Sequence, residues 1–131
     1  MKIEARAEIA TALEVRGLSV ELGKRPIVTD MRLDVASGGW LCIIGPNGAG
    51  KTTLVHAIGG LVPHTGSVRL WGRPFEELGR RERARAVAVV PQLPAIPDGF
   101  TVEQYVLLGR TPHLGPLAGE GARDIEAVAT A

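Results

Sequence analysis

The chain has 131 residues, a formal net charge of +1 and 45% hydrophobic residues, which is enough for one domain with a buried core. The small net charge gives no argument for nucleic acid or an anionic membrane surface as a partner. A single cysteine, Cys42, excludes an internal disulfide and suits a reducing compartment. The N-terminus lacks a secretory signal, and every apolar run is shorter than the ~20 residues of a membrane helix. The sequence therefore predicts a cytoplasmic protein.

The first third of the chain indicates an antiparallel sheet. After a loose or helical lead over residues 1–11, residues 12–22 alternate apolar and polar side chains, as a strand with one buried face does. A turn over 23–26 separates them from a second strand pattern over 27–35. A short apolar run over 40–44 then predicts a buried strand.

The strongest signal follows that run, as an unbroken match to the phosphate-loop pattern G-x-x-x-x-G-K-[ST]. Its residues are Gly45, Pro46, Asn47, Gly48, Ala49, Gly50, Lys51 and Thr52. Glycines let the backbone turn its amides toward an anion, and a helix expected over 53–58 adds free amides and the positive end of its dipole. Lys51 suits the β- and γ-phosphates, Thr52 suits Mg²⁺, and Thr53 suits the α-phosphate. The alternative is a glycine-rich turn with a solvated lysine.

The rest of the chain alternates short strands and helices. The helix after the loop is expected to stop at the glycine pair 59–60, since glycine favours a helix C-terminus. Strands that first alternate and later become wholly apolar predict two sheets, one antiparallel and one parallel. The later predicted elements are a strand over 66–71, a helix over 76–85, an apolar strand over 86–90, a proline-rich loop over 91–99, a helix over 101–109 and a helix-prone tail over 120–131.

Together these motifs resemble the ATPases of the ATP-binding-cassette (ABC) family, over roughly residues 12–128. The matching stretches occur in the family's order, and the last of them is also similar to ATPases of importers for iron-siderophores, haem and vitamin B12. They are the loop 45–54, the strand 64–68, the Q-loop-like run 89–92, the run 101–103 that resembles the opening of the helical subdomain, and the run 106–115.

The resemblance implies an α/β fold: a P-loop NTPase core with a parallel sheet, an antiparallel β subdomain and the start of a helical subdomain. Residues 12–131 then form the N-terminal part of a nucleotide-binding domain. Lys51 and the loop amides hold the phosphates of ATP, and Thr52 ligates Mg²⁺. Gln92 reaches the metal ion and the attacking water, which a neutral amide can orient without taking its proton. Lys51 and Gln92 are thus the implied catalytic residues.

The same resemblance implies partners and a place in the cell. The partners are ATP, a transmembrane permease subunit and a second nucleotide-binding domain, at the cytoplasmic face of the cell membrane. The implied process is ATP-driven import of an iron-siderophore or a similar metal chelate.

Two departures from the family pattern stand out. Family members stack the adenine on an aromatic side chain near position 22, but Leu22 stands there and residues 1–39 hold no Tyr, Phe or Trp. We therefore expect apolar contact with the base, without stacking that is typically worth ~1–3 kcal/mol. The second departure is the absence of the acidic pair after four apolar residues, the Leu-Ser-Gly-Gly signature and the switch histidine. The simplest interpretation is an N-terminal fragment with negligible turnover by itself.

Several alternatives stay open. The chain could be a nucleotide-binding module without chemistry, or a small-molecule P-loop kinase.

Arginines over 80–85 are interpreted as a solvated helix face rather than an anion patch. Apolar residues over 100–108 could form core or a partner groove. Trp40 and Cys42 are interpreted as packing residues, and the histidines as structural or exposed rather than catalytic: His56, His64 and His113.

Overall fold

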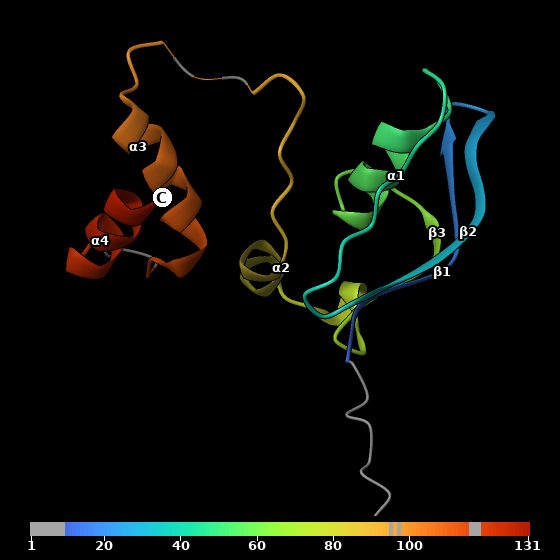
Figure 1. The fold of residues 1–131 in the computed structure, drawn as a ribbon, viewed down its shortest axis with the longest axis horizontal. Coiled ribbons are helices and arrows are strands. Elements are labelled where there is room, and N and C mark those ends of the chain that lie inside the picture. The colour runs from blue at the N-terminus through green and yellow to red at the C-terminus, as the bar shows by residue number, and fades with distance from the viewer. Residues whose placement is uncertain (1–9, 95, 97, 116–118) are drawn as a thin grey trace, which may run out of the picture. The chain divides into compact units, whose positions relative to one another are not determined.

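The computed structural model describes residues 10–94, 96, 98–115 and 119–131. The chain divides into two compact units, one up to Gly79 and one from Arg80 to Ala131 (Figure 1). The lead predicted over 1–11 lies almost wholly outside the described residues. Within the described ranges, no helix combines the length and the apolar character needed to cross a bilayer.

The first unit is built on a four-stranded antiparallel sheet in the order β2-β1-β3-β4 (Figure 1). Leu22 pairs with Arg25 at the hairpin turn between the two long strands, and Leu13 pairs with Leu70 on the other side of β1. The alternating patterns over 12–22 and 27–35 thus form the antiparallel β subdomain that the sequence predicts. The strands are β1 (Thr11–Leu22), β2 (Arg25–Ala36), β3 (Thr65–Leu70) and β4 (Arg73–Pro74).

An irregularity in β1 decides which of its residues enter the core. The register of β1 shifts between Val15 and Leu18, where Gly17 has a φ of 62°. Because side chains alternate between faces, a shift of this kind lets Val15 and Leu18 both be fully buried although their numbers differ in parity. Gly66 of β3 crosses beside this point, and a Cβ on it would lie 2.4 Å from the carbonyl oxygen of Gly17.

The core of the first unit lies between the sheet and α1 (Lys51–Ile58), which contacts both β1 and β2 (Figure 1). Leu54 and Ala57 are the buried residues of this helix. The helix ends at Gly59, whose N–H donates to the carbonyl oxygen of Val55 at 2.9 Å, so the predicted stop is confirmed. The remaining core side chains, all apolar, are Val15, Leu18, Val20, Val28, Val68, Leu70, Phe75 of the 3₁₀ helix η1 (Phe75–Glu77), and Leu78.

The second unit consists of short helices joined by side-chain hydrogen bonds. Arg85 Nε donates to the carbonyl oxygen of Pro112 at 2.9 Å, and Arg110 Nε donates to Asp124 Oδ1 at 2.9 Å. Asp124 Oδ2 also accepts the N–H of Gly121 at 3.0 Å. The predicted helices over 101–109 and 120–131 are thus present. The elements are α2 (Arg80–Ala86), α3 (Val102–Leu107), the 3₁₀ helix η2 (Leu108–His113) and α4 (Ala122–Thr130).

Two predicted strands are not formed. Residues 40–44 and 86–90 contain no strand; the first of these runs is irregular throughout. Trp40 is fully exposed and Cys42 is exposed, so their interpretation as packing residues is wrong for this structure. A buried parallel strand needs hydrogen-bonded neighbours and apolar cover, and neither run has them among the described residues. The predicted parallel sheet is accordingly absent from the described part of the chain.

Candidate phosphate-binding site

The predicted phosphate loop leads directly into α1. Gly48 and Gly50 have φ of 81° and 85°, in the left-handed region that favours glycine. Inside the loop, the N–H of Ala49 donates to the carbonyl oxygen of Pro46 at 3.3 Å. The first bond of the helix runs from the N–H of Leu54 to the carbonyl oxygen of Gly50 at 2.8 Å.

Three backbone amides at the start of α1 are therefore available to a ligand. The amides of Lys51, Thr52 and Thr53 have no hydrogen-bond partner within the described chain. Free amides in the first turn of a helix, together with its dipole, form a favourable environment for an anion. These three amides are thus not consumed internally, whereas the amide of Ala49 in the loop is bound to the carbonyl oxygen of Pro46.

Gly50 attaches the loop to the sheet. A Cβ at this position would lie 2.8 Å from the carbonyl oxygen of Ile27 and 3.3 Å from Cγ2 of Val28. Space and backbone angle both require glycine here, so the end of the loop lies directly against β2.

Lys51 folds back over the loop. Its Nζ donates to the carbonyl oxygens of Gly45 and Pro46, each at 2.7 Å. The ammonium therefore bridges the last part of the motif to its first two residues. A phosphate group that attracts the ammonium has to replace these two carbonyl partners.

The other predicted ligands divide between the two units. Thr52 is exposed and Thr53 is partly buried, both in the first turn of α1 beside the free amides. A threonine hydroxyl is a hard oxygen donor, which fits Mg²⁺ when phosphate oxygens and water supply the other ligands. Gln92 lies in the second unit, exposed and in irregular backbone, so its predicted role stays a prediction.

A cavity of about 300 Å³ adjoins the loop. It shares Ala49, Gly50 and Lys51 with the loop, and the rest of its wall consists of residues 27–29 and 31 of β2, residues 43–44, and Leu54 of α1. Sequence reasoning did not predict this wall. The alternation of β2 indicates a strand with two faces, but it does not indicate that the loop packs against one of them.

The histidines lie apart from the loop motif. His56 is in the second half of α1, and His113 ends η2. His64 follows α1 in irregular backbone, with Nε2 3.8 Å from Oε1 of Glu76 and a side chain only 11% exposed. Among the described residues there is no cluster of three or more His, Cys, Asp or Glu side chains that could hold a metal ion.

The remaining predicted surfaces are in the second unit. Arg80 and Arg81 are exposed, in agreement with a solvated helix face. Arg85 instead donates a hydrogen bond to the carbonyl oxygen of Pro112. Phe100 and Leu108 are 42% and 50% exposed.

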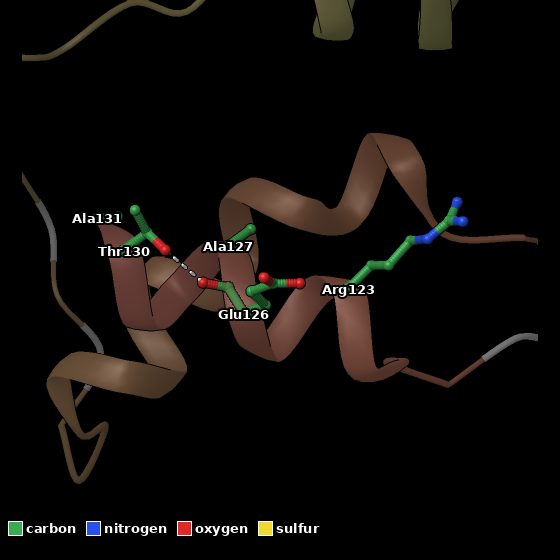
Figure 2. A pocket seen from close by; sticks show the side chains of 5 residues that line it. All are labelled: Arg123, Glu126, Ala127, Thr130 and Ala131. Carbon is green, nitrogen blue, oxygen red and sulfur yellow. Dashed lines mark hydrogen bonds between the residues drawn. The ribbon is translucent and has the colours of Figure 1, made fainter.

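Figure 2 shows a shallow hollow along α4, where Thr130 Oγ1 donates to the carbonyl oxygen of Glu126 at 2.8 Å. Its lining, from Arg123 to Ala131, belongs to the last part of the chain only, mostly to one helix. A single helix face brings no groups together from different elements, so we assign it no role.

Comparison with known proteins places these features in a family. The model of the ABC transporter family matches residues 28–130. The hemin import ATP-binding protein HmuV of Pseudomonas entomophila (strain L48) is 44% identical over 77% of this chain and 40% of its own length. HmuV of Myxococcus xanthus (strain DK1622) is 41% identical over 92% of this chain and 45% of its own. The cobalamin import ATP-binding protein BtuD of Halobacterium salinarum (strain ATCC 29341 / DSM 671 / R1) is 40% identical over 77% of this chain. The chain spans less than half the length of these relatives.

Solved structures give the fold. A structure of the ATP binding subunit of an ABC transporter is 28% identical, with a TM-score of 0.68 over 82% of this chain and 44% of its own. A structure described as an inward-facing, metal-chelate type ABC transporter has a TM-score of 0.67 over 89% of this chain, at 23% identity. The predicted α/β fold class is thereby confirmed, although two of its predicted strands are not formed in this chain.

Proposed function

Because this chain belongs to the ABC transporter family, we propose that its loop binds the triphosphate of ATP together with Mg²⁺. The observation that supports this most directly is the set of free amides of Lys51, Thr52 and Thr53, next to the left-handed Gly48 and Gly50. An anion placed there meets backbone N–H groups, the helix dipole and a lysine ammonium at once.

Lys51, Thr52 and Thr53 have distinct parts in the proposed binding. The ammonium of Lys51 leaves the carbonyl oxygens of Gly45 and Pro46 and binds oxygens of the β- and γ-phosphates. The hydroxyl of Thr52 ligates Mg²⁺, and Thr53 binds the α-phosphate. When bound, Mg²⁺ neutralises charge on the β- and γ-phosphates.

We also propose that the chain is part of an ATPase. Residues 12–131 then form the N-terminal part of a nucleotide-binding domain, and Gln92 orients water near the metal ion. The complete protein works with a second nucleotide-binding domain and a transmembrane permease, at the cytoplasmic face of the membrane. By itself, the 131-residue chain is expected to turn over ATP negligibly, because it lacks the acidic pair and the signature motif.

For the cargo, the relatives favour a metal chelate. Two of them are named for hemin import and one for cobalamin import, and both cargoes are metal ions held in an organic ring. We propose import of a metal chelate, with an iron-siderophore as the narrower proposal.

The test is calorimetric titration of the chain with Mg-ATP. We expect saturable binding. Its affinity should fall at least tenfold in Lys51→Ala, because the phosphates lose the positive charge of the lysine ammonium. Lys24→Ala is the matched control, since Lys24 is an exposed lysine in the hairpin turn of the same unit. Equal binding by the wild-type chain and Lys51→Ala, or no binding by either, contradicts the proposal.

A further inference from the structure

The chain has two tryptophans, and both lie at the end of the sheet where β1 begins. The N–H of Trp71 donates to the carbonyl oxygen of Ala12 at 2.9 Å. On the other side of β1, the chain leaves β2 at Ala36, whose carbonyl oxygen accepts the N–H of Gly39 at 2.9 Å, and Trp40 follows directly. Because neighbouring strands lie about 4.8 Å apart, the two segments that carry the tryptophans lie about 10 Å apart across β1.

Both rings are exposed to solvent. Trp40 is fully exposed, Trp71 is 58% exposed, and Leu41 beside Trp40 is 48% exposed. The hollows lined by the phosphate loop, by α4 and by residues 63–65 include neither tryptophan. We call Trp40, Leu41 and Trp71 the tryptophan surface. It presents large apolar side chains outside these hollows.

The backbone of Trp71 is strained. Trp71 and Gly72 form the two-residue turn between β3 and β4, with φ of 47° and 77°. Such a turn favours Asn or Asp before the glycine, whereas a bulky side chain at positive φ is a conformational outlier. A residue that strains its turn and remains mostly exposed is not explained by the stability of the fold. Strain of this kind points to a function of the side chain.

We propose that the tryptophan surface binds the interface of a phospholipid bilayer. An indole ring combines a large apolar body with one polar N–H, so it suits the level between the acyl chains and the headgroups. Two rings at one end of a sheet enter a bilayer together, without a preformed pocket. No nucleotide takes part, so this binding is independent of the function proposed for the phosphate loop.

The cations around the rings fit anionic headgroups. Segments 10–13, 35–42 and 70–75 make up this end of the sheet, and Arg73 is their one charged residue. Arg69 adds a second cation, because its Nη1 donates to the carbonyl oxygen of Gly72 at 3.0 Å and so lies at the Trp71 turn. Arginines beside exposed indoles favour a surface that contains lipids such as phosphatidylglycerol.

The nearest carboxylates of the sheet are engaged in ion pairs. Arg16 lies 2.6 Å from Asp34 and 3.4 Å from Glu14, and Glu14 also lies 3.9 Å from Arg69. The next acid along the chain after the turn, Glu76, lies 3.8 Å from His64. These pairs reduce the repulsion that an anionic surface would otherwise meet at this end of the sheet.

The experiment uses intrinsic fluorescence, because Trp40 and Trp71 are the only tryptophans of the chain. The chain is titrated with vesicles of equal parts phosphatidylcholine and phosphatidylglycerol. We expect a saturable blue shift of the emission, and quenching by lipids brominated in their acyl chains, because the rings leave water. Absence of either signal overturns the proposal. A blue shift that grows with protein concentration without vesicles indicates a second copy as the partner and also overturns it.

Lipid composition tests the part assigned to the arginines. Vesicles of phosphatidylcholine alone should bind about fivefold more weakly or less, because one arginine near an anionic surface contributes about this factor. Equal affinity for the two kinds of vesicle contradicts a contribution of Arg69 and Arg73.

Co-sedimentation of variants with the mixed vesicles locates the surface. Trp40→Ser and Trp71→Asn should each weaken binding about tenfold, because each removes one ring from the bilayer. Asn suits the turn better than Trp, so unfolding does not account for a loss in Trp71→Asn. Leu22→Asn is the control for vesicle binding, since Leu22 is 50% exposed at the opposite end of β1. Unchanged binding of both tryptophan variants, or an equal loss in Leu22→Asn, overturns the proposal.

Discussion

A Cβ atom on Gly50 would stand 2.8 Å from the carbonyl oxygen of Ile27, which is closer than the two atoms can approach. The last glycine of the loop therefore packs directly against β2. Since Leu54 and Ala57 of α1 are buried in the same unit, the sheet fixes the helix and the end of the loop together. The loop owes its position to packing as well as to its own backbone angles.

This contact predicts unequal effects of alanine at the two left-handed glycines of the loop. Gly48→Ala and Gly50→Ala both force a side chain into the left-handed region, at about 1–2 kcal/mol. Only Gly50→Ala adds a clash, because a Cβ on Gly48 meets nothing within 4 Å. We expect Gly50→Ala to lose a further ~1–3 kcal/mol of unfolding free energy in urea titrations. Equal losses in the two variants argue against the contact with Ile27.

The same comparison applies where Gly66 of β3 lies against Gly17 of β1. A Cβ on Gly66 would lie 2.4 Å from the carbonyl oxygen of Gly17, while one on Gly72 would meet open space. Both glycines have positive φ, of 84° and 77°. Gly66→Ala is expected to lower the thermal midpoint of the first unit clearly more than Gly72→Ala, by several degrees. Similar midpoints for the two variants contradict the close pairing of β1 with β3 at Gly17.

The bridge made by Lys51 predicts a change in the ligand-free loop. Lys51→Met keeps the length of the side chain but removes both hydrogen bonds, to Gly45 and Pro46. We expect faster hydrogen exchange at the Ala49 amide, whose own bond to Pro46 spans the same turn. The amide of Val55, inside α1, should exchange as in the wild-type chain. Unchanged exchange at Ala49 means that the lysine does not hold the empty loop.

The lowered pKa of Asp124 predicts that the stability of the helices in the second unit depends on pH. Hydrogen bonds from the Gly121 N–H, and then from Arg110, lower the pKa of the Asp124 carboxyl below its usual value. A carboxyl with a lower pKa in the folded state stabilises that state above its unfolded pKa of about 3.9, and this stabilisation is lost as the pH falls through the folded value.

The measurement is helical circular dichroism between about pH 5 and pH 2. Helix content of the wild-type chain should fall at the acid end, and Asp124→Asn should show lower stability at pH 5 with a flatter acid response. Glu120→Gln is a suitable control, because Glu120 is an exposed acid near the same helix. If Asp124→Asn loses helix content as steeply as the wild-type chain when the pH falls, protonation of Asp124 is not the cause of the loss.

Local signals in the sequence predict the elements that are stabilised locally. The alternation over 12–35 predicts the hairpin of β1 and β2, and the glycine pair after residue 58 predicts the end of α1. The phosphate-loop pattern predicts backbone angles that favour glycine at Gly45, Gly48 and Gly50, and of these Gly48 and Gly50 have a positive φ while Gly45 does not. In each case the cause lies within a few residues of the element, so a single sequence is sufficient.

Elements that depend on distant partners could not be predicted in the same way. The apolar runs 40–44 and 86–90 have the composition of buried strands, but a strand exists only where another strand pairs with it. Ile44 and Val90 are each 89% exposed because nothing among the described residues covers them. Likewise, the wall that β2 gives to the cavity follows from where the loop packs, which the alternation of β2 does not contain.

The start of α3 confirms a local prediction, and it gives a sharp test. The sequence predicts a helix beginning at Thr101, with acidic Glu103 close behind. In the structure, Thr101 Oγ1 accepts the N–H of Gln104 at 3.2 Å, and Gln104 Oε1 accepts the N–H of Thr101 at 2.9 Å. These reciprocal bonds form a capping box, which satisfies two amides that a helix leaves free.

Thr101→Ala should therefore destabilise α3 by about 1 kcal/mol, because a capping hydroxyl is lost. Thr101→Ser keeps the hydroxyl and should retain most of the wild-type stability, whereas Glu103→Gln keeps the cap and should have little effect. Urea titration monitored by helical circular dichroism separates these variants. If Thr101→Ser is as unstable as Thr101→Ala, the methyl group rather than the capping hydroxyl is what stabilises this helix.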